Sequence, residues 1–296
     1  MLENQLIGYA SALLAGLFFG LSDALVRAAS VKIKPFQNLL ISLILGLPFL
    51  WIFAIIKGLT SMSFATVLYF VIAGLLNFVI GRLLFYISIA NVGATAASIL
   101  TSPTVIVSSL LAWILLGEDL TFIQITGIIL VVVSVLIVSL KPSGESLHGG
   151  KTSVGIAAGL ASTIVFAVTA ILVRQATNYM GGDPLVGVAI SYTSALPIVV
   201  LMNDGIPNLR SLPKKHFYFM STAALVVASA QLSRYLAFNY IKVAEASVMM
   251  SLFPFFTLLF TLLLEHEVKE TAKPIHLFAA SLAVTGVILT NYIGVS

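Results

Sequence analysis

Long apolar segments recur along the whole chain, and short polar stretches separate them. Each segment has about the 20 residues that an α-helix needs to cross the hydrocarbon core of a bilayer. Charged side chains lie mostly in the connections between the segments. The pattern therefore predicts an all-α integral membrane protein with ten transmembrane helices. The predicted helices are residues 6–29, 36–56, 64–89, 93–116, 122–140, 153–175, 185–202, 217–240, 245–264 and 275–294.

The second half of the sequence repeats the first. The segment Leu25–Arg27 returns as Leu172–Arg174, and Arg82 on the third apolar segment corresponds to Arg234 on the eighth. Each half holds five membrane-length segments, an odd number, so the second copy must cross the bilayer in the opposite direction. Two inverted five-helix repeats around a central site are a common design of secondary transporters. We expect a first repeat at 1–141, a linker at 142–152 and a second repeat at 153–296.

Composition agrees with a membrane protein. Hydrophobic residues make up 59% of the 296 positions and charged residues 9%, whereas soluble domains carry about 25% charged residues. The net charge is +4 without a basic block, which excludes a nucleic-acid binding protein and fits loops that face an anionic membrane surface. The absence of cysteine excludes disulfides and thiol catalysis. The Gly- and Ser-rich linker Lys141–Lys151 is expected to be exposed and dispensable.

A set of short motifs occurs in the same order in both halves. The first-half members are Phe19-Gly20, Arg27, Ala94-Thr95, Pro103 and Gly117-Glu118, and the second-half members are Arg174, Ala246-Ser247, Pro254 and Glu267. Together they resemble the drug/metabolite transporter (DMT) superfamily, EamA type, although Pro103 lies two residues early and His266 replaces the second-half glycine. The resemblance implies ten helices, a central substrate cavity, and export or exchange of small metabolites such as amino acids across the cell membrane.

Asp23 is the one acid in the interior of a predicted helix, because the other acids fall in connections or at helix ends. An ionised side chain at membrane depth costs about 2.5–3.5 kcal/mol on insertion scales, so its presence needs a reason. Arg27 follows one helical turn later, and the two residues could form a neutralising pair. Alternatively, Asp23 is a proton carrier or a contact for a cationic group of the substrate. The sequence leaves both interpretations open.

Arg82 and Arg234 are the candidate substrate ligands, because they occupy equivalent positions in the two halves. A guanidinium group that faces a bundle interior suits a carboxylate or phosphate, to which it donates two parallel hydrogen bonds. The alternative is that both side chains reach a membrane interface or bind backbone carbonyls. By helical spacing, Phe85 and Tyr86 share the face of Arg82, and Gln231, Tyr235 and Phe238 share the face of Arg234.

Other polar and helix-breaking residues complete the candidate site. Pro103 and Pro254 each remove a helical hydrogen bond, which predicts kinks in the fourth and ninth helices. Ser98 and Thr101 lie beside Pro103 and either contact the substrate or satisfy the local backbone. Asn77, with Ser229 as its second-half counterpart, is a further candidate for the cavity wall, alongside a purely structural role.

Signatures of catalysis are missing. His266-Glu267 begins a string like HExxH, but Glu270 stands where the second zinc ligand would be. The sequence holds no Walker A, GxGxxG or GxSxG motif. We therefore expect no enzyme, no metal site and no cofactor, so that active transport would need a gradient or exchange.

The leading function is a secondary permease for a small anionic or zwitterionic metabolite such as an amino acid. It would work by alternating access with proton coupling or exchange, as a multi-pass monomer or homodimer in the lipid bilayer of the cell membrane. The alternative is a flippase, or flippase subunit, for a lipid-linked head group. A membrane scaffold without transport activity is a third class.

Both termini are predicted to lie on one side of the membrane. Lysine and arginine gather in or beside the connections that follow the odd-numbered helices. By the positive-inside rule these connections face the cytoplasm, which places the termini outside. The family resemblance instead favours cytoplasmic termini. Single cysteines introduced at Leu2 and at Val295 are expected to react with an impermeant thiol reagent from the same side, and labelling from opposite sides would contradict ten helices.

Overall fold

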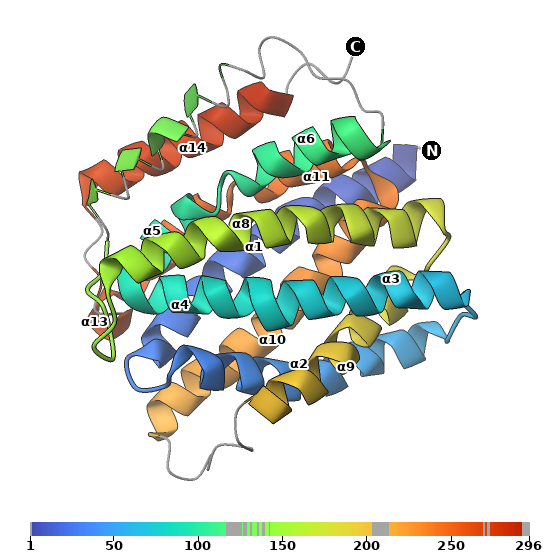
Figure 1. Ribbon diagram of the computed structural model, residues 1–296, viewed down its shortest axis with the longest axis horizontal. Coiled ribbons are helices and arrows are strands. Elements are labelled where there is room, and N and C mark those ends of the chain that lie inside the picture. The colour runs from blue at the N-terminus through green and yellow to red at the C-terminus, as the bar shows by residue number, and fades with distance from the viewer. Residues whose placement is uncertain are drawn as a thin grey trace.

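The computed structural model describes most of the chain, and every long described segment is an α-helix (Figure 1). Within the described residues, six helices are long and apolar enough to cross a membrane, and they match the first four predicted helices and the sixth and seventh. The all-α membrane fold is therefore confirmed. The described residues are 2–116, 126, 129–130, 132–134, 136–137, 140–141, 143–202, 213–268, 270 and 273–291.

The first half begins with helices that follow the prediction closely. Pro35 opens α2, where its fixed φ suits the first helical turn. Ser63 caps α3 by accepting a hydrogen bond from the backbone N–H of Thr66 (3.1 Å). The elements are α1 (Leu2–Ser30), α2 (Pro35–Lys57), α3 (Phe64–Gly74), the π-helical segment η1 (Leu75–Arg82), α4 (Leu83–Val92), α5 (Ala94–Leu100) and α6 (Thr104–Leu116).

The predicted helix 93–116 is divided in the structure. A turn at 101–103 separates α5 from α6, directly at Pro103, which cannot donate a helical hydrogen bond. The α3, η1 and α4 segments, in contrast, form one continuous helix, Phe64–Val92. Gly93 ends this helix with a φ of +94°, a backbone conformation that glycine adopts without strain.

The second half repeats this order. Another turn, at 251–252, separates α11 from α12 just before Pro254. The elements are α8 (Thr152–Arg174), the π-helical segment η2 (Gln175–Tyr179), α9 (Pro184–Met202), α10 (Lys214–Tyr240), α11 (Val243–Met250), α12 (Phe253–Leu263), α13 (Glu265–Val268) and α14 (Pro274–Asn291). The predicted helix 122–140 and the Gly117-Glu118 motif lie largely outside the described residues.

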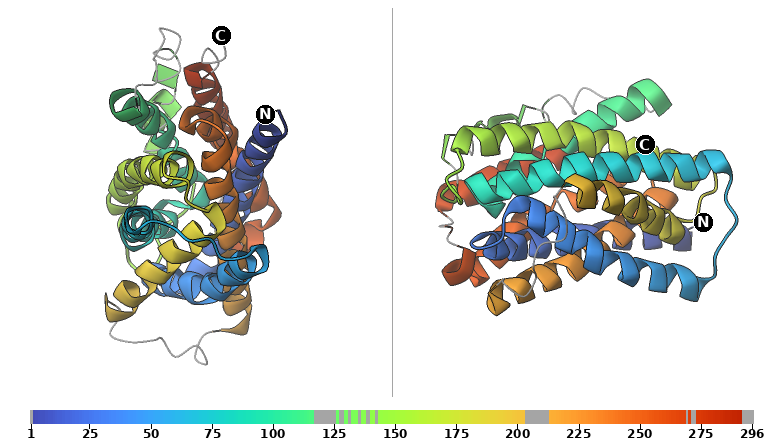
Figure 2. Two further views of the ribbon diagram at one scale, coloured as in Figure 1. Left: turned by 90° about the vertical axis from the view of Figure 1, so that its right-hand side faces the viewer. Right: turned by 60° about the horizontal axis from the view of Figure 1, so that its bottom comes forward.

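The helices of the two halves pack reciprocally. The first helix of each half lies along the third helix of the other half: α1 packs along α10, and α8 packs along η1 and α4. The second helices, α2 and α9, pack against each other. Figures 1 and 2 show α2 and α9 together on one side of the bundle and α14 on the opposite side. This exchange of partners is the packing expected of two inverted repeats.

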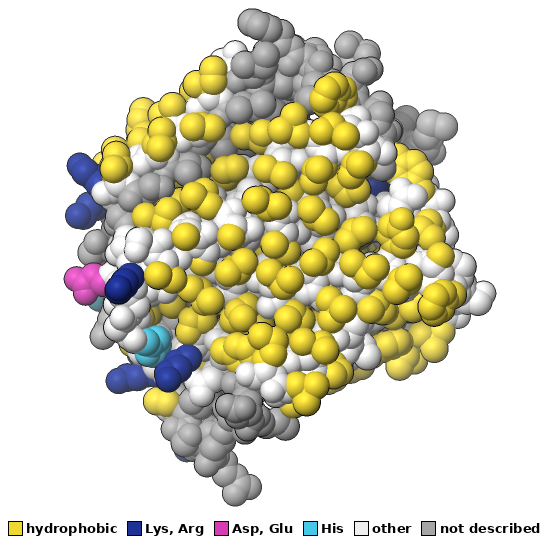
Figure 3. Space-filling view, viewed as in Figure 1, with side chains coloured by type: hydrophobic (Ala, Val, Ile, Leu, Met, Phe, Trp, Pro, Cys, Tyr) yellow, Lys and Arg dark blue, Asp and Glu magenta, His cyan; other side chains and the backbone are white. Residues whose placement is uncertain are grey.

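The two ends of the bundle differ in charge. In Figure 1, α1 begins and α14 ends at the same end of the bundle, as the sequence predicts for the two termini. Charged side chains on the face shown in Figure 3 gather at the opposite end, while hydrophobic side chains cover the area between. Large apolar side chains that are exposed, such as Phe64 (82% exposed), suit contact with lipid.

Small residues on α1 allow it to lie very close to the second half. A Cβ atom added to Gly16 would come 3.0 Å from the carbonyl oxygen of Met250, and one added to Gly20 would come 2.7 Å from the backbone nitrogen of Thr257. Membrane helices commonly use small residues for such close backbone contact. The width of any space between the two halves therefore depends on how closely α1 approaches α11 and α12.

A larger side chain at Gly20 should separate α1 from α12. We expect Gly20→Leu to lower the stability of the folded protein by roughly 1–3 kcal/mol or more, because the contact is with backbone and cannot adjust cheaply. Thermal unfolding of the purified protein in detergent measures the effect. Leu14→Val, on the part-exposed face of the same helix, is the control and should change little. An equal midpoint for both variants would contradict the close approach.

Candidate functional site

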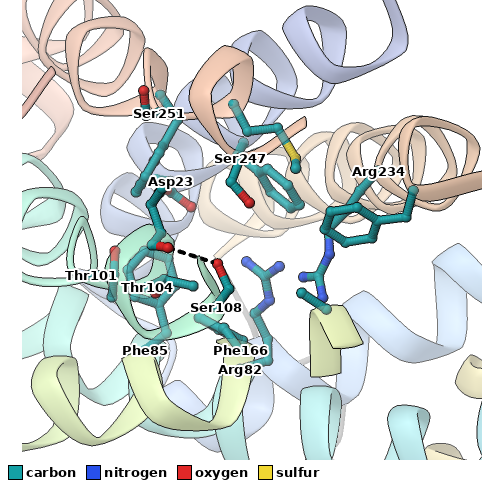
Figure 4. A pocket seen from close by; sticks show the side chains of 16 residues that line it. Asp23, Arg82, Phe85, Thr101, Thr104, Ser108, Phe166, Arg234, Ser247 and Ser251 are labelled. Carbon is teal, nitrogen blue, oxygen red and sulfur yellow. Dashed lines mark hydrogen bonds between the residues drawn. The ribbon is translucent and has the colours of Figure 1, made fainter. Parts of the chain in front are cut away.

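A cavity lies where helices of both halves meet (Figure 4). Its volume is about 110 Å³, enough for several water molecules or a small organic molecule. The wall combines three charged groups, five phenylalanine rings and a group of hydroxyls. The charged groups are Asp23, Arg82 and Arg234; the rings are Phe19, Phe85, Phe166, Phe238 and Phe253; the hydroxyls belong to Thr101, Thr104, Ser108, Ser247 and Ser251.

Arg82 enters the cavity from η1 and is 4% exposed. Four aromatic rings surround its guanidinium carbon, with centroids at 5.3 Å (Phe19), 5.6 Å (Phe166), 5.8 Å (Phe85) and 5.8 Å (Tyr86). The ring faces attract the positive charge but accept none of its directed hydrogen bonds. Among the described residues, no carboxylate lies within 4.0 Å of it and no hydrogen bond is formed. Its donors therefore remain available to a ligand.

The π-helical geometry of η1 explains the direction of two side chains. In a π-helix the hydrogen bonds run between residues five apart, so such residues lie on nearly the same side. Asn77 and Arg82 have this spacing, and both point inward from η1. In a regular α-helix, residues five apart would point in different directions. The sequence alone could not predict this, because nothing in the apolar pattern distinguishes a π-turn.

Arg234 enters the same cavity from α10. Its Nη1 donates to the Oδ1 of Asn77 (3.3 Å), and its guanidinium carbon lies 5.5 Å from the ring centroid of Phe238. Its Nε and Nη2 are buried and have no hydrogen-bond partner in the described part of the chain. In Figure 4, the side chains of Arg82 and Arg234 point into one space. Two like charges in one apolar cavity favour binding of an anion.

Asp23 lines the cavity from α1 and is 1% exposed. Neither carboxylate oxygen has a hydrogen-bond partner, and no described cation lies within 4.0 Å. The neutralising pair with Arg27 is therefore wrong. Arg27 points away from the cavity, because backbone carbonyls at the end of α4 bind it instead.

Two arginines that the repeat relates have a structural role. Arg27 donates from Nη1 to the carbonyl oxygens of Ile89 and Ala90 (both 2.9 Å), at the C-terminal end of α4. Its counterpart Arg174 donates from Nη1 to the carbonyl oxygen of Phe238 (2.7 Å), near the C-terminal end of α10. The last carbonyls of a helix lack helical partners and favour a cation. In each half, the first helix thus caps the third.

Several predicted ligands support the cavity wall without lining it. Phe85, Phe238, Thr101, Arg82, Arg234 and Asp23 lie on the wall, whereas Tyr86, Tyr235, Asn77, Gln231 and Ser98 lie behind it. Tyr86 packs on Arg82, and Asn77 positions Arg234. Tyr235 donates its hydroxyl to the Oγ of Ser191 (2.9 Å), which turns it away from the cavity.

Three further candidate residues do not line the cavity. Ser98 donates to the carbonyl oxygen of Thr95 (2.8 Å), so its hydroxyl serves the local backbone. Gln231 is fully buried, and the described residues offer no partner to its amide. Ser229, the second-half counterpart of Asn77, does not line the cavity. It lies on α10, which has no π-turn to rotate its side chain inward, and it donates to the carbonyl oxygen of Leu225.

Of the hydroxyls on the wall, Thr101 alone was a predicted ligand. Ser108 donates to the carbonyl oxygen of Val105 (3.0 Å) and Thr101 to that of Ser98 (2.9 Å), so these oxygens offer lone pairs to the cavity. The breaks at 101–103 and 251–252 change the helical phase, so the inward faces of α6 and α11 could not be projected from their neighbours. Phe19 and Phe166 carried a signal, because they match between the two halves.

No group of three or more His, Asp and Glu side chains that could hold a metal ion occurs within the described residues. The cavity wall likewise presents one carboxylate and no histidine. The wall combines the hydrogen-bond donors of Arg82 and Arg234, the oxygens of Asp23 and the hydroxyls, and aromatic rings.

Comparisons with known proteins show the family to which the chain belongs. A family model described as the EamA-like transporter family matches residues 6–140 and again residues 153–292. A solved structure titled "Crystal structure of protein" is similar over 99% of this chain and 97% of its own, with a TM-score of 0.69 and 14% identity, which shows a shared fold. No curated protein matches the chain. Because the family model covers both repeats, the chain belongs to the EamA-like transporter family, a family of multi-pass membrane transporters of small molecules.

Proposed function

We propose that this protein is a secondary permease of the cell membrane for a small anionic or zwitterionic metabolite, such as an amino acid. The observation that carries the proposal is the Arg82 guanidinium, buried in the cavity without an acceptor among the described residues. A buried cation without a counter-ion is costly, and the cost falls when an anionic ligand arrives. A carboxylate fits best, because a guanidinium binds it through two parallel hydrogen bonds.

The charge balance of the cavity supports the same class of substrate. Arg82 and Arg234 contribute two positive charges and Asp23 contributes one carboxylate. A carboxylate on the substrate would bind the arginines, and an ammonium group on a zwitterion would be placed to interact with Asp23. The aromatic rings between these groups suit an apolar part of the same molecule. Polycations would meet two like charges and are disfavoured.

Asp23 also fits a role in coupling. Its carboxylate faces the cavity and forms no ion pair with the described residues, so it is free to gain or lose a proton as the cavity is filled and emptied. The inverted halves meet at the cavity, so rocking of one half against the other would expose it to each side in turn. Proton coupling or exchange would then drive net transport.

Replacement of either arginine by lysine should weaken binding although the charge remains. We expect Arg82→Lys and Arg234→Lys each to raise the Kd of a carboxylate ligand about tenfold, because the planar fork is lost. The measurement is thermal stabilisation of the purified protein across anionic, zwitterionic and cationic metabolites, since a ligand that binds only the folded state raises the Tm. Lys215→Arg, at an exposed ion pair, is the control. Unchanged affinity in both variants, or a preference for cations, would contradict the proposal.

Asp23→Asn should separate coupled transport from exchange. The asparagine keeps the size of the side chain but cannot carry a proton, so uphill uptake into proteoliposomes under a pH gradient should be lost. Counterflow exchange of labelled substrate should persist, because it needs no net proton movement. A variant that still accumulates substrate like the wild type would show that Asp23 does not couple transport.

A further inference from the structure

The linker between the halves is built into the charged end of the bundle. Residues 143–147 are here called the strap. Ser143 is buried and the residues after it are at least partly exposed, but the backbone of the strap is hydrogen-bonded to the bundle. Gly144 donates its N–H to the carbonyl oxygen of Val92 (2.9 Å), and Leu147 donates to that of Ala90 (3.0 Å). The strap therefore runs along the end of α4 and is part of the fold.

Arg27 joins the strap to both halves. From its fully buried position on α1 it donates to Ile89 and Ala90 of α4, as described above. Its Nη2 donates to the carbonyl oxygen of Glu145 in the strap (2.8 Å), and its Nε donates to that of Val268 in α13 (3.0 Å). One side chain thus bonds the first half, the strap and the second half.

Glu270 makes the same connection from the second half. Its carboxylate is 4% exposed at residue level and accepts from the backbone N–H groups of Ala94 (2.7 Å) and Thr95 (2.9 Å) in α5. It also accepts from the Oγ of Ser143 in the strap (2.6 Å), and it lies 4.0 Å from the Nε of Arg27. Arg27, Ser143 and Glu270, here called the lock, are the side chains that fasten this end.

The lock leaves no room for a solute. A Cβ atom added to Gly144 would come 2.6 Å from Nη2 of Arg27 and 2.9 Å from Cα of Gly93. One added to Gly93 would come 2.8 Å from Cδ of Glu270. Backbone, guanidinium and carboxylate are therefore in direct contact across this end.

The lock lies between the cavity and the charged end of the bundle. Arg27 follows the cavity residue Asp23 by one turn of α1, about 6 Å along the helix axis. Thr95, which Glu270 binds, opens the short helix α5, and the cavity residue Thr101 directly follows that helix. The lock therefore lies next to the cavity along both α1 and α5, toward this end of the bundle.

We propose that the strap and the lock form the closed gate of the transport path at this end, and that the gate opens when Glu270 releases the strap and α5. The proposal rests on the transport function proposed above. Arg27 and Glu270 are buried charges whose hydrogen bonds offset the cost of their burial. Because breaking some of these bonds would leave a buried charge partly unpaired, the bonds of the lock break together. Such an interface has two discrete states, closed and hydrated, as a gate requires.

A single cysteine can report the opening, because the natural chain contains none. Thr95→Cys is suitable: the side chain is fully buried, its hydroxyl has no partner among the described residues, and the N–H that Glu270 binds is kept. The rate at which an impermeant thiol reagent labels this cysteine, in protein reconstituted in nanodiscs, measures how often the gate is open. Substrate is not needed, so the result does not depend on the substrate assignment.

Two variants weaken the lock by different means. Glu270→Gln removes the charge that strengthens three hydrogen bonds, and Ser143→Ala removes the hydroxyl between Glu270 and the strap. We expect Glu270→Gln to raise the labelling rate of Thr95→Cys about tenfold or more, and Ser143→Ala to raise it by a smaller factor. Glu267→Gln is the matched control, because Glu267 lies nearby on α13 but pairs only with the exposed Lys215; it should leave the rate unchanged.

A second reporter distinguishes a gate from general loosening. Thr177→Cys is buried in η2, at the other end of α8, and its labelling should not increase in the lock variants. Unchanged labelling of Thr95→Cys in both variants would overturn the proposal, provided that the cysteine reacts fully in denatured protein. An equal rise at both reporters would also overturn it, since the lock would then only stabilise the fold.

Discussion

A guanidinium group buried in an apolar bundle must find its acceptors within the protein, and this constraint divides the structure into scaffold and site. The four described arginines are all buried. Arg27 and Arg174 bind carbonyls at helix ends and connect elements. Arg82 and Arg234 reach the cavity with donors that the described residues leave unused. The same residue type thus builds the framework where acceptors are present, and under the function proposed above it would bind the substrate where they are missing.

The sequence predicts the fold well because lipid imposes a simple rule. Every backbone group in the bilayer must be bonded within the protein, so long apolar segments become helices whatever their detailed sequence. The duplication then fixes how the two halves are related. The local deviations escape this reasoning. The turn at 101–103 follows from Pro103, but the π-turn in η1 depends on packing between helices that no single segment records.

The site is predictable only where charge makes a residue conspicuous. Asp23, Arg82 and Arg234 stand out because ionised groups are rare at membrane depth, and all three line the cavity. Ser108 and Ser247 also line it, but hydroxyls are common in membrane helices and carry no signal. The partner of Arg27 is mispredicted for a related reason. Spacing along one helix favours Asp23, whereas the carbonyls that bind Arg27 are distant in sequence, such as that of Ile89 in α4, 62 residues away.

The π-turn in η1 makes the duplication asymmetric at its centre. The corresponding third helix of the second half, α10, is regularly α-helical from Lys214 to Tyr240. If the halves simply exchanged conformations during a transport cycle, η1 would have to tighten and α10 would have to acquire a wide turn. Under the alternating-access mechanism proposed above, the inward- and outward-facing forms would then not be related by the symmetry of the repeats and would differ in free energy. An empty carrier built in this way would rest facing one compartment, and its forward and return steps would run at different rates.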